Sequence, residues 1–238
     1  MATMVSRPSK AHIDDCYFTG MSVVILGVVL LGFSRTYYLA GTVLAPLPSI
    51  IIHIHAVVFS CWILLLIAQT SLVAAGRTGW HMKIGILGAI LAPLIVVLGL
   101  AAAIDTQKRH TAIPGVEPPM ILAIQFAVLA TFAFLVTKGI GARRDGQAHK
   151  RLMLLSTIVL LGPAINRWPF AVFLRFPPAT GFVIDILLLS LFAFDYLTRR
   201  KIHRVTVWGS LMIFVMVPCA SALSRLPFWH HFTAWLRR

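Results

Sequence analysis

Long apolar runs alternate with short polar stretches along the whole chain. A membrane helix needs about 20 mostly apolar residues, and seven runs qualify, with approximate limits 19–41, 50–75, 83–104, 119–138, 151–172, 181–198 and 206–224. The sixth run is short and the seventh is interrupted by Pro218, so six spans are the alternative. Because lipid-exposed backbone must satisfy its own hydrogen bonds, the pattern predicts an all-α polytopic transmembrane helix bundle, a single domain over residues 1–238.

The composition excludes the two other broad classes of protein. Hydrophobic residues make up 59% of the chain without glycine, whereas soluble domains reach roughly 45–50% with glycine included. Charged residues are 12% of the chain, so polar side chains are too few to cover a water-soluble enzyme. Disorder requires low hydrophobicity and high charge, and it is excluded for the same reason.

Positive charge gathers in the polar stretches between the apolar runs. The formal net charge is +14, and of the 21 Lys and Arg residues 13 fall in the N-terminal tail and the even-numbered loops, against 8 on the other side. Lys and Arg concentrate in cytoplasmic loops. We therefore predict a cytoplasmic tail at 1–18 and an external interfacial tail at 225–238. The lipid bilayer, a membrane protein or a second copy are the expected partners, and nucleic acid is not.

The third apolar run combines a histidine with a line of small residues. His81, Gly85, Gly88, Ala92 and Gly99 fall within about 40° of one line on a helix of 3.6 residues per turn. Small residues let another helix backbone approach closely, and the same smooth groove would admit a flat macrocycle ligated by His81. The sequence leaves both interpretations open.

The fifth run begins at a second histidine, His149, and carries a polar stripe that continues through Ser156 to Arg167. In the predicted topology His81 and His149 lie at matching depths, at the cytoplasmic ends of two helices. Two such histidines are the minimum for bis-histidine haem ligation, and they also suit a quinone head group, a lipid phosphate or a metal ion. The plainer alternative is that both are interfacial anchors in basic loops.

Further polar residues lie inside the spans, where they are costly and often functional. His55 and Gln69 share one stripe of the second run, and His55 is a candidate ligand or proton relay as well as a packing residue. Arg167 and Asp185 are expected at similar depths on consecutive helices, so we predict a structural ion pair between them. Gln69, Ser156, Arg167 and His55 are also the candidates for lining a small-ligand cavity.

Four segments resemble a family of bacterial membrane proteins of unknown function. They are GFSRTYYLAG from Gly32, HIHAVVFSCWILLLIAQT from His53, GRTGWHMKIG from Gly76 and AHKRLMLLSTIVLLGPAINR from Ala148. The resemblance covers roughly residues 14–170 and implies a bacterial inner-membrane protein without supplying an activity. A looser resemblance is to small haem-b membrane cytochromes, although this chain has too few histidines in its spans for two haems.

Three functions remain open, since no HExxH, GxSxG, P-loop or dinucleotide-binding motif is present and no catalytic residue is predicted. The first is a redox protein that holds one haem b, or a quinone, at His81 and His149, with Gly85, Gly88 and His55 as further binding residues. The second is a non-redox small-ligand transporter or binder. The third is an accessory subunit whose smooth third helix docks a partner.

Overall fold

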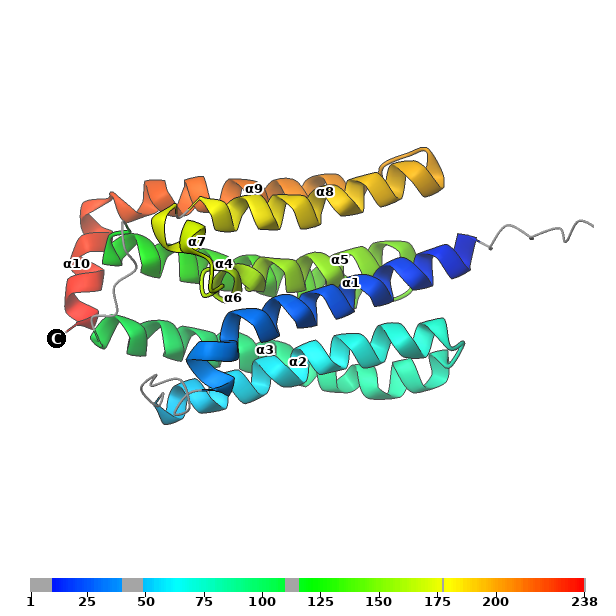
Figure 1. Ribbon diagram of the computed structural model, residues 1–238, viewed down its shortest axis with the longest axis horizontal. Helices are drawn as coiled ribbons and strands as arrows, with labels where there is room; N and C mark the ends of the chain where they lie inside the picture. Colours follow the sequence, from blue (N-terminus) through cyan, green and yellow to red (C-terminus); the bar gives the residue numbers. More distant parts are fainter. Residues whose placement is uncertain (1–9, 40–48, 110–115, 177, 238) are drawn as a thin grey trace, which may run out of the picture.

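The computed structural model describes residues 10–39, 49–109, 116–176 and 178–237, and their regular structure is helical (Figure 1). The elements are α1 Lys10–Phe33, the π-helical η1 Ser34–Tyr38, α2 Ile50–Ala74, α3 Thr78–Lys108, α4 Pro118–Gly141, α5 Gly146–Ile158, the 3₁₀ segment η2 Val159–Leu161, α6 Gly162–Ile165, α7 Ala171–Arg175, α8 Ala179–Arg199, α9 Arg204–Ser224 and α10 Pro227–Leu236. The chain is an all-α helix bundle, as its sequence predicts.

Seven helices of the described part are long and apolar enough to cross a bilayer. They are His12–Tyr38, Ile50–Ala74, Thr78–Lys108, Pro118–Gly141, Gly146–Ile165, Ala179–Arg199 and Arg204–Ser224. The protein is therefore a multi-pass membrane protein, and the count is seven rather than the alternative of six. Pro218 lies within α9 without ending it.

The bundle has two chemically different ends (Figure 1). We call one the basic end, because the turns between α2 and α3, α4 and α5, and α8 and α9 meet there and carry Arg77, Arg143, Arg144, Arg200 and Lys201. α1 begins at this end. At the opposite end α10 runs across the bundle axis, and the Trp229 indole nitrogen donates a hydrogen bond to the carbonyl of Pro119 at the start of α4.

The fifth span forms the centre of the bundle. Leu155, Ile158 and Ile165 are fully buried, and they pack with Phe132 of α4 and Leu191 of α8 in one apolar cluster. α2 and α3 lie at the periphery, with many apolar side chains exposed to the surrounding lipid. Because the fifth span touches most of its neighbours, the residues at its start are held by several helices at once.

Two predicted boundaries differ from the structure. The fifth span was expected over 151–172 but ends at Ile165, because the chain turns at Asn166 and Arg167 and a residue before proline, here Trp168 before Pro169, disfavours helical backbone. Arg167 therefore lies beyond the span instead of on its polar stripe. The predicted tail at 1–18 is also shorter, since α1 begins at Lys10.

Gly32 brings α1 and α6 into direct backbone contact. A Cβ atom added to Gly32 would lie 2.1 Å from the carbonyl oxygen of Ala164, which no side chain tolerates. This contact fixes the end of the fifth span against the end of the first.

Candidate functional site

His81 and His149 face each other at the basic end. His81 lies in the first turn of α3 and His149 in the first turn of α5, and their ring centroids are 6.1 Å apart with the ring planes at 89°. This edge-to-face arrangement brings together two imidazoles whose residues are 68 positions apart in the chain. Both residues are half-buried.

The His149 ring is held in a defined orientation. Its Nδ1 atom lies 2.8 Å from the carbonyl oxygen of Gly139 in α4, and since a carbonyl only accepts, Nδ1 carries the proton. Asp145 caps α5 by accepting hydrogen bonds from the amides of Gln147 and Ala148 at 3.0 and 3.1 Å, which fixes where the helix begins. In the tautomer with the proton on Nδ1, the lone pair is on Nε2, where a ligand can bind.

Gln69 of α2 adds a third polar side chain beside the pair. The His81 ring lies against the Gln69 backbone, and the Gln69 Nε2 atom is 3.5 Å from the position of a Cβ on Gly85. The Oε1 atom of Gln69 and the Nδ1 atom of His81 are buried and have no hydrogen-bond partner among the described residues. Buried polar atoms are nearly always hydrogen-bonded, so these two atoms suit the polar group of a ligand.

The glycine face of α3 does not provide the groove for a macrocycle. A Cβ on Gly85 would meet Gln69, and one on Gly88 would meet Leu65, each at the 3.5 Å of ordinary contact with α2. The small residues at Gly85 and Gly88 therefore face α2, which favours helix packing over a porphyrin as their role. The described residues also hold no group of three or more His, Cys, Asp or Glu side chains arranged for a metal ion.

The residues expected to line a small-ligand cavity do not share a site. Ser156 is fully buried and donates to the carbonyl of Met153 in its own helix at 2.8 Å. His55 stacks on Phe59, one turn along α2, with ring centroids 4.1 Å apart, and its buried Nδ1 has no partner in the described part of the chain. Of this set, Gln69 alone lies beside the histidine pair.

The predicted ion pair between Arg167 and Asp185 is not formed. The Arg167 guanidinium donates to the carbonyl of Pro163 at 2.7 Å and lies over the Phe33 ring, 5.2 Å from its centroid. Asp185 makes no ion pair with any described residue. The pairing was wrong because the fifth span ends before Arg167, which then folds back on its own turn.

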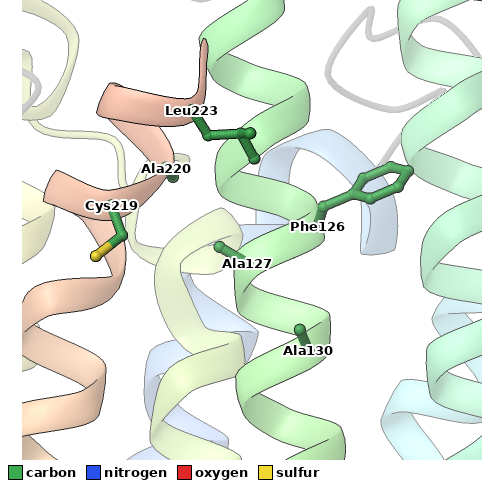
Figure 2. A pocket seen from close by; sticks show the side chains of 6 residues that line it. All are labelled: Phe126, Ala127, Ala130, Cys219, Ala220 and Leu223. Carbon is green, nitrogen blue, oxygen red and sulfur yellow. The ribbon is translucent and has the colours of Figure 1, made fainter. Parts of the chain in front are cut away.

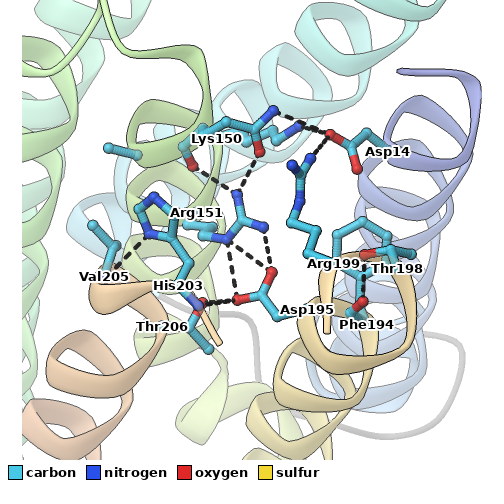
Figure 3. A network of polar contacts seen from close by, with 12 residues as sticks. Asp14, Lys150, Arg151, Phe194, Asp195, Thr198, Arg199, His203, Val205 and Thr206 are labelled. Carbon is cyan, nitrogen blue, oxygen red and sulfur yellow. Dashed lines mark hydrogen bonds and ion pairs between the residues drawn. The ribbon is translucent and has the colours of Figure 1, made fainter. Parts of the chain in front are cut away.

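A different and fully buried ion pair stands at the basic end (Figure 3). The Arg151 guanidinium of α5 pairs with the Asp195 carboxylate of α8, and both side chains are 0% exposed. Arg151 also donates to the carbonyl and Oε1 of Gln147, at 2.9 and 2.8 Å. Asp195 in turn accepts from the Thr206 hydroxyl at 2.6 Å and from the His203 amide at 3.0 Å.

A second carboxylate extends this network to α1 (Figure 3). The buried carboxylate of Asp14 accepts hydrogen bonds from Lys150 at 2.5 Å, from Arg199, and from the side-chain amide of Gln147 at 3.2 Å. The basic end is thus closed by charged groups from α1, α5 and α8 and by hydrogen-bond donors from the start of α9. Lys150 and Arg151 directly follow His149, so the network also anchors the segment that carries one histidine of the candidate site.

The sequence contained a signal for this network that the prediction of ion pairs did not use. Arg151 begins the fifth apolar run and Asp195 lies near the end of the sixth, so the alternating topology places both at the basic end. Arg167 and Asp185 were paired because they were expected at similar depths in the membrane, and the same criterion selects Arg151 and Asp195. Asp14 carries a weaker signal, since it precedes the first run and is recognisable as buried once α1 is seen to begin at Lys10.

The bundle also has an apolar groove between α4 and α9, of about 290 Å³ (Figure 2). It is lined by Phe126, Ala127, Ala130, Cys219, Ala220 and Leu223. With no charged or hydrogen-bonding side chain except the Cys219 thiol, it offers nothing to orient a polar substrate. The histidine pair is therefore the better candidate for chemistry.

No family model, curated protein or solved structure matches the chain. The family resemblance drawn from the sequence motifs stays a prediction, and the function has to be argued from the geometry of the basic end.

Proposed function

We propose that the protein binds the head group of a membrane-soluble quinone or quinol at Gln69, His81 and His149, and exchanges protons with it. The observation that carries the proposal is the pairing of two imidazoles, whose ring centroids are 6.1 Å apart, together with the buried Nδ1 of His81 and the buried Oε1 of Gln69, which lack partners among the described residues. Imidazole is the side chain suited to proton exchange near neutral pH. The site also lies at an end of membrane-spanning helices, where a lipid-soluble molecule presents its polar head.

Each residue has a distinct role in this proposal. The His149 Nε2 atom accepts the proton of a quinol hydroxyl, since Nδ1–H is already bound to Gly139. His81 and the Gln69 amide hydrogen-bond the ring oxygens and orient the head group. Oxidation of a quinol releases two protons and two electrons, so the proton of the second hydroxyl passes to His81 and a partner redox protein accepts both electrons. Haem is not part of the proposal, because α2 covers the glycine face of α3.

A neutral head group suits the site better than an anion. Lys83, two residues after His81, is turned onto the ring of Trp80, 5.1 Å from its centroid. Lys150, next to His149, is bound to Asp14. The two lysines nearest in the sequence therefore have other partners, and the side chains shown at the pair itself are imidazole and amide groups.

We further propose that the basic end faces the cytoplasm of a bacterium and that the protein lies in the inner membrane. The excess of Lys and Arg in the even-numbered loops supports this orientation, and the motif resemblance supports the bacterial membrane. The proposed site then exchanges protons with the cytoplasmic side.

The test is photolabelling of the purified full-length protein, in liposomes, with an azido-quinone. We expect labelling of peptides that contain the basic ends of α2, α3 or α5, with strong loss in His81→Leu and in His149→Leu. His53→Leu is the matched control, because this histidine of α2 bonds to Tyr37 at the opposite end, 3.1 Å away.

Three labelling results would overturn the proposal. They are equal labelling of all variants, labelling confined to other helices, and competition by an anionic phospholipid but not by unlabelled quinone, which would make the site one for a lipid phosphate. A haem absorption spectrum in the purified protein, lost in His81→Leu, would replace the quinone with haem.

A further inference from the structure

The two aspartates of α8 have opposite surroundings. Asp195 is fully buried and receives hydrogen bonds from Arg151, His203 and Thr206. Asp185 is half-exposed and has no ion pair among the described residues. It lies four residues from the helix midpoint at position 189, about 6 Å along the axis, so it stands within the hydrocarbon layer. A carboxylate at that depth is costly unless it is paired.

Asp185 borders a continuous apolar stripe that the described chain leaves uncovered except at Phe182, where the ring of Phe176 stacks on it. Phe182, Ile186 and Leu189 are 60%, 63% and 63% exposed, and Ala193 continues the line. The spacings of four, three and four residues are those of the seam through which one membrane helix packs against another. Gly181, one turn before Asp185, has no atom within 4 Å of a Cβ position, so a neighbouring backbone has room to approach there.

We propose that this face of α8 docks a transmembrane helix of a different protein, and that the partner helix carries a Lys or Arg that pairs with Asp185. Charge complementarity selects the partner, since a cation at the same depth neutralises the carboxylate and satisfies its hydrogen bonds. The apolar stripe supplies the packing surface on which the two helices align.

A second copy of the chain does not supply the cation. Lys83 and Lys138 lie near the basic end, and Arg35 and Arg167 lie in segments at the opposite end. Arg151 is fully buried and already paired. The other described Lys and Arg residues, Arg175 at the end of α7 among them, lie at helix ends or in the turns between helices and not in the middle of a span, so we infer that the partner is another protein.

The experiment uses full-length protein and a synthetic helix of 21 leucines and alanines with one central lysine, in liposomes. A central position makes the direction of insertion irrelevant, and fluorescence energy transfer reports association. We expect the lysine peptide to bind about tenfold more tightly than the same peptide with leucine at the centre, a difference of about 1.4 kcal/mol. A peptide with a central glutamate should bind no better than the leucine peptide.

Variants separate the charge from the packing surface. Asp185→Leu should abolish the preference for the lysine peptide. Ala193→Trp should weaken the binding of both the lysine and the leucine peptide, because the larger side chain obstructs the stripe. Val207→Trp, at an exposed site on α9, is the control and should change neither. Binding of the lysine peptide that survives in Asp185→Leu would overturn the proposal. Energy transfer between two copies that depends on Asp185 would also overturn it, because the occupant would then be the chain itself.

Discussion

Arg151 and Asp195 form an ion pair that is completely removed from solvent, with the Arg151 Nε atom 3.1 Å from Oδ1 of the carboxylate. Each partner has its remaining hydrogen-bonding capacity filled, Arg151 by Gln147 and Asp195 by Thr206 and His203. Buried ion pairs are often no more stabilising than apolar residues of similar volume, but removal of one partner strands a charge. The stability of the protein is therefore affected most when only one residue of the pair is replaced.

We expect Asp195→Leu to destabilise the protein by about 3–5 kcal/mol, the cost of leaving a buried charge uncompensated. The double variant Arg151→Met with Asp195→Leu should recover a large part of that loss. The measurement is the free energy of unfolding in mixed detergent micelles. If the double variant is as unstable as the sum of the two single variants, the two residues are not coupled.

Gly32 offers a second test, of the contact between α1 and α6. In Gly32→Ala the new methyl group would lie 2.1 Å from the backbone oxygen of Ala164, so the helices have to separate. We expect a loss at or above the upper end of the roughly 1–3 kcal/mol of ordinary overpacking, measured by the same unfolding assay.

Gly27→Ala is the matched control, because a Cβ at Gly27 meets no atom within 4 Å. It should be neutral, or stabilising by up to about 1 kcal/mol through helix propensity. Equal effects of the two substitutions would show that the loss at Gly32 comes from the helix itself and not from Ala164.

The seven spans were predictable because hydrophobic length alone determines which segments cross a bilayer. The end of the fifth span was not, since Trp168, Phe170 and Val172 continue the apolar run beyond Ile165, where the helix ends. Hydropathy reports the environment of a residue, whereas the end of the helix depends on local backbone geometry at Asn166 and Arg167, just before Pro169. The misplacement of Arg167 follows directly from this.

The approach of His81 to His149 was expected from matched depth, and their rings do lie together. The glycines beside them were harder to interpret, because a small residue serves a ligand and a neighbouring helix equally well in sequence. In the structure Gly85 faces Gln69 and Gly88 faces Leu65, so these small residues accommodate the neighbouring helix α2. Which helices lie next to each other depends on the whole bundle, and it cannot be predicted from the pattern of residues on one helix.

Reporter fusions test the orientation that the charge distribution predicts. A fusion after residue 145, in the turn between α4 and α5, should be cytoplasmic, and a fusion after residue 109, at the end of α3, should be external, because Lys and Arg gather on the first side. Paired alkaline phosphatase and green fluorescent protein reporters distinguish the two. An external fusion at 145 would reverse the orientation, and it would place the proposed proton exchange on the other side.

His203 makes the stability of the basic end depend on pH. Its Nδ1 atom accepts a hydrogen bond from the Val205 amide at 3.2 Å and so caps α9 while the ring is neutral. Burial, followed by the positive charge of Arg151, holds the pKa of His203 below its usual 6.5, against the opposing effect of Asp195 and Asp145. The folded state therefore prefers the neutral ring more than the unfolded state does.

The sign of the pH effect follows from that preference. The contribution of His203 is complete above about pH 6.5, and it is lost as the pH falls from there through the lowered pKa of the folded state. We expect His203→Asn, which keeps a capping side chain without a proton to gain, to lose less unfolding free energy than the parent protein between pH 7 and pH 5. Because the other histidines are common to both proteins, their titration cancels in the comparison.

His231→Asn, at an exposed position of α10, is the control and should follow the parent protein at every pH. A His203→Asn variant whose stability falls with pH as steeply as the parent's would show that the cap on α9 does not sense protonation.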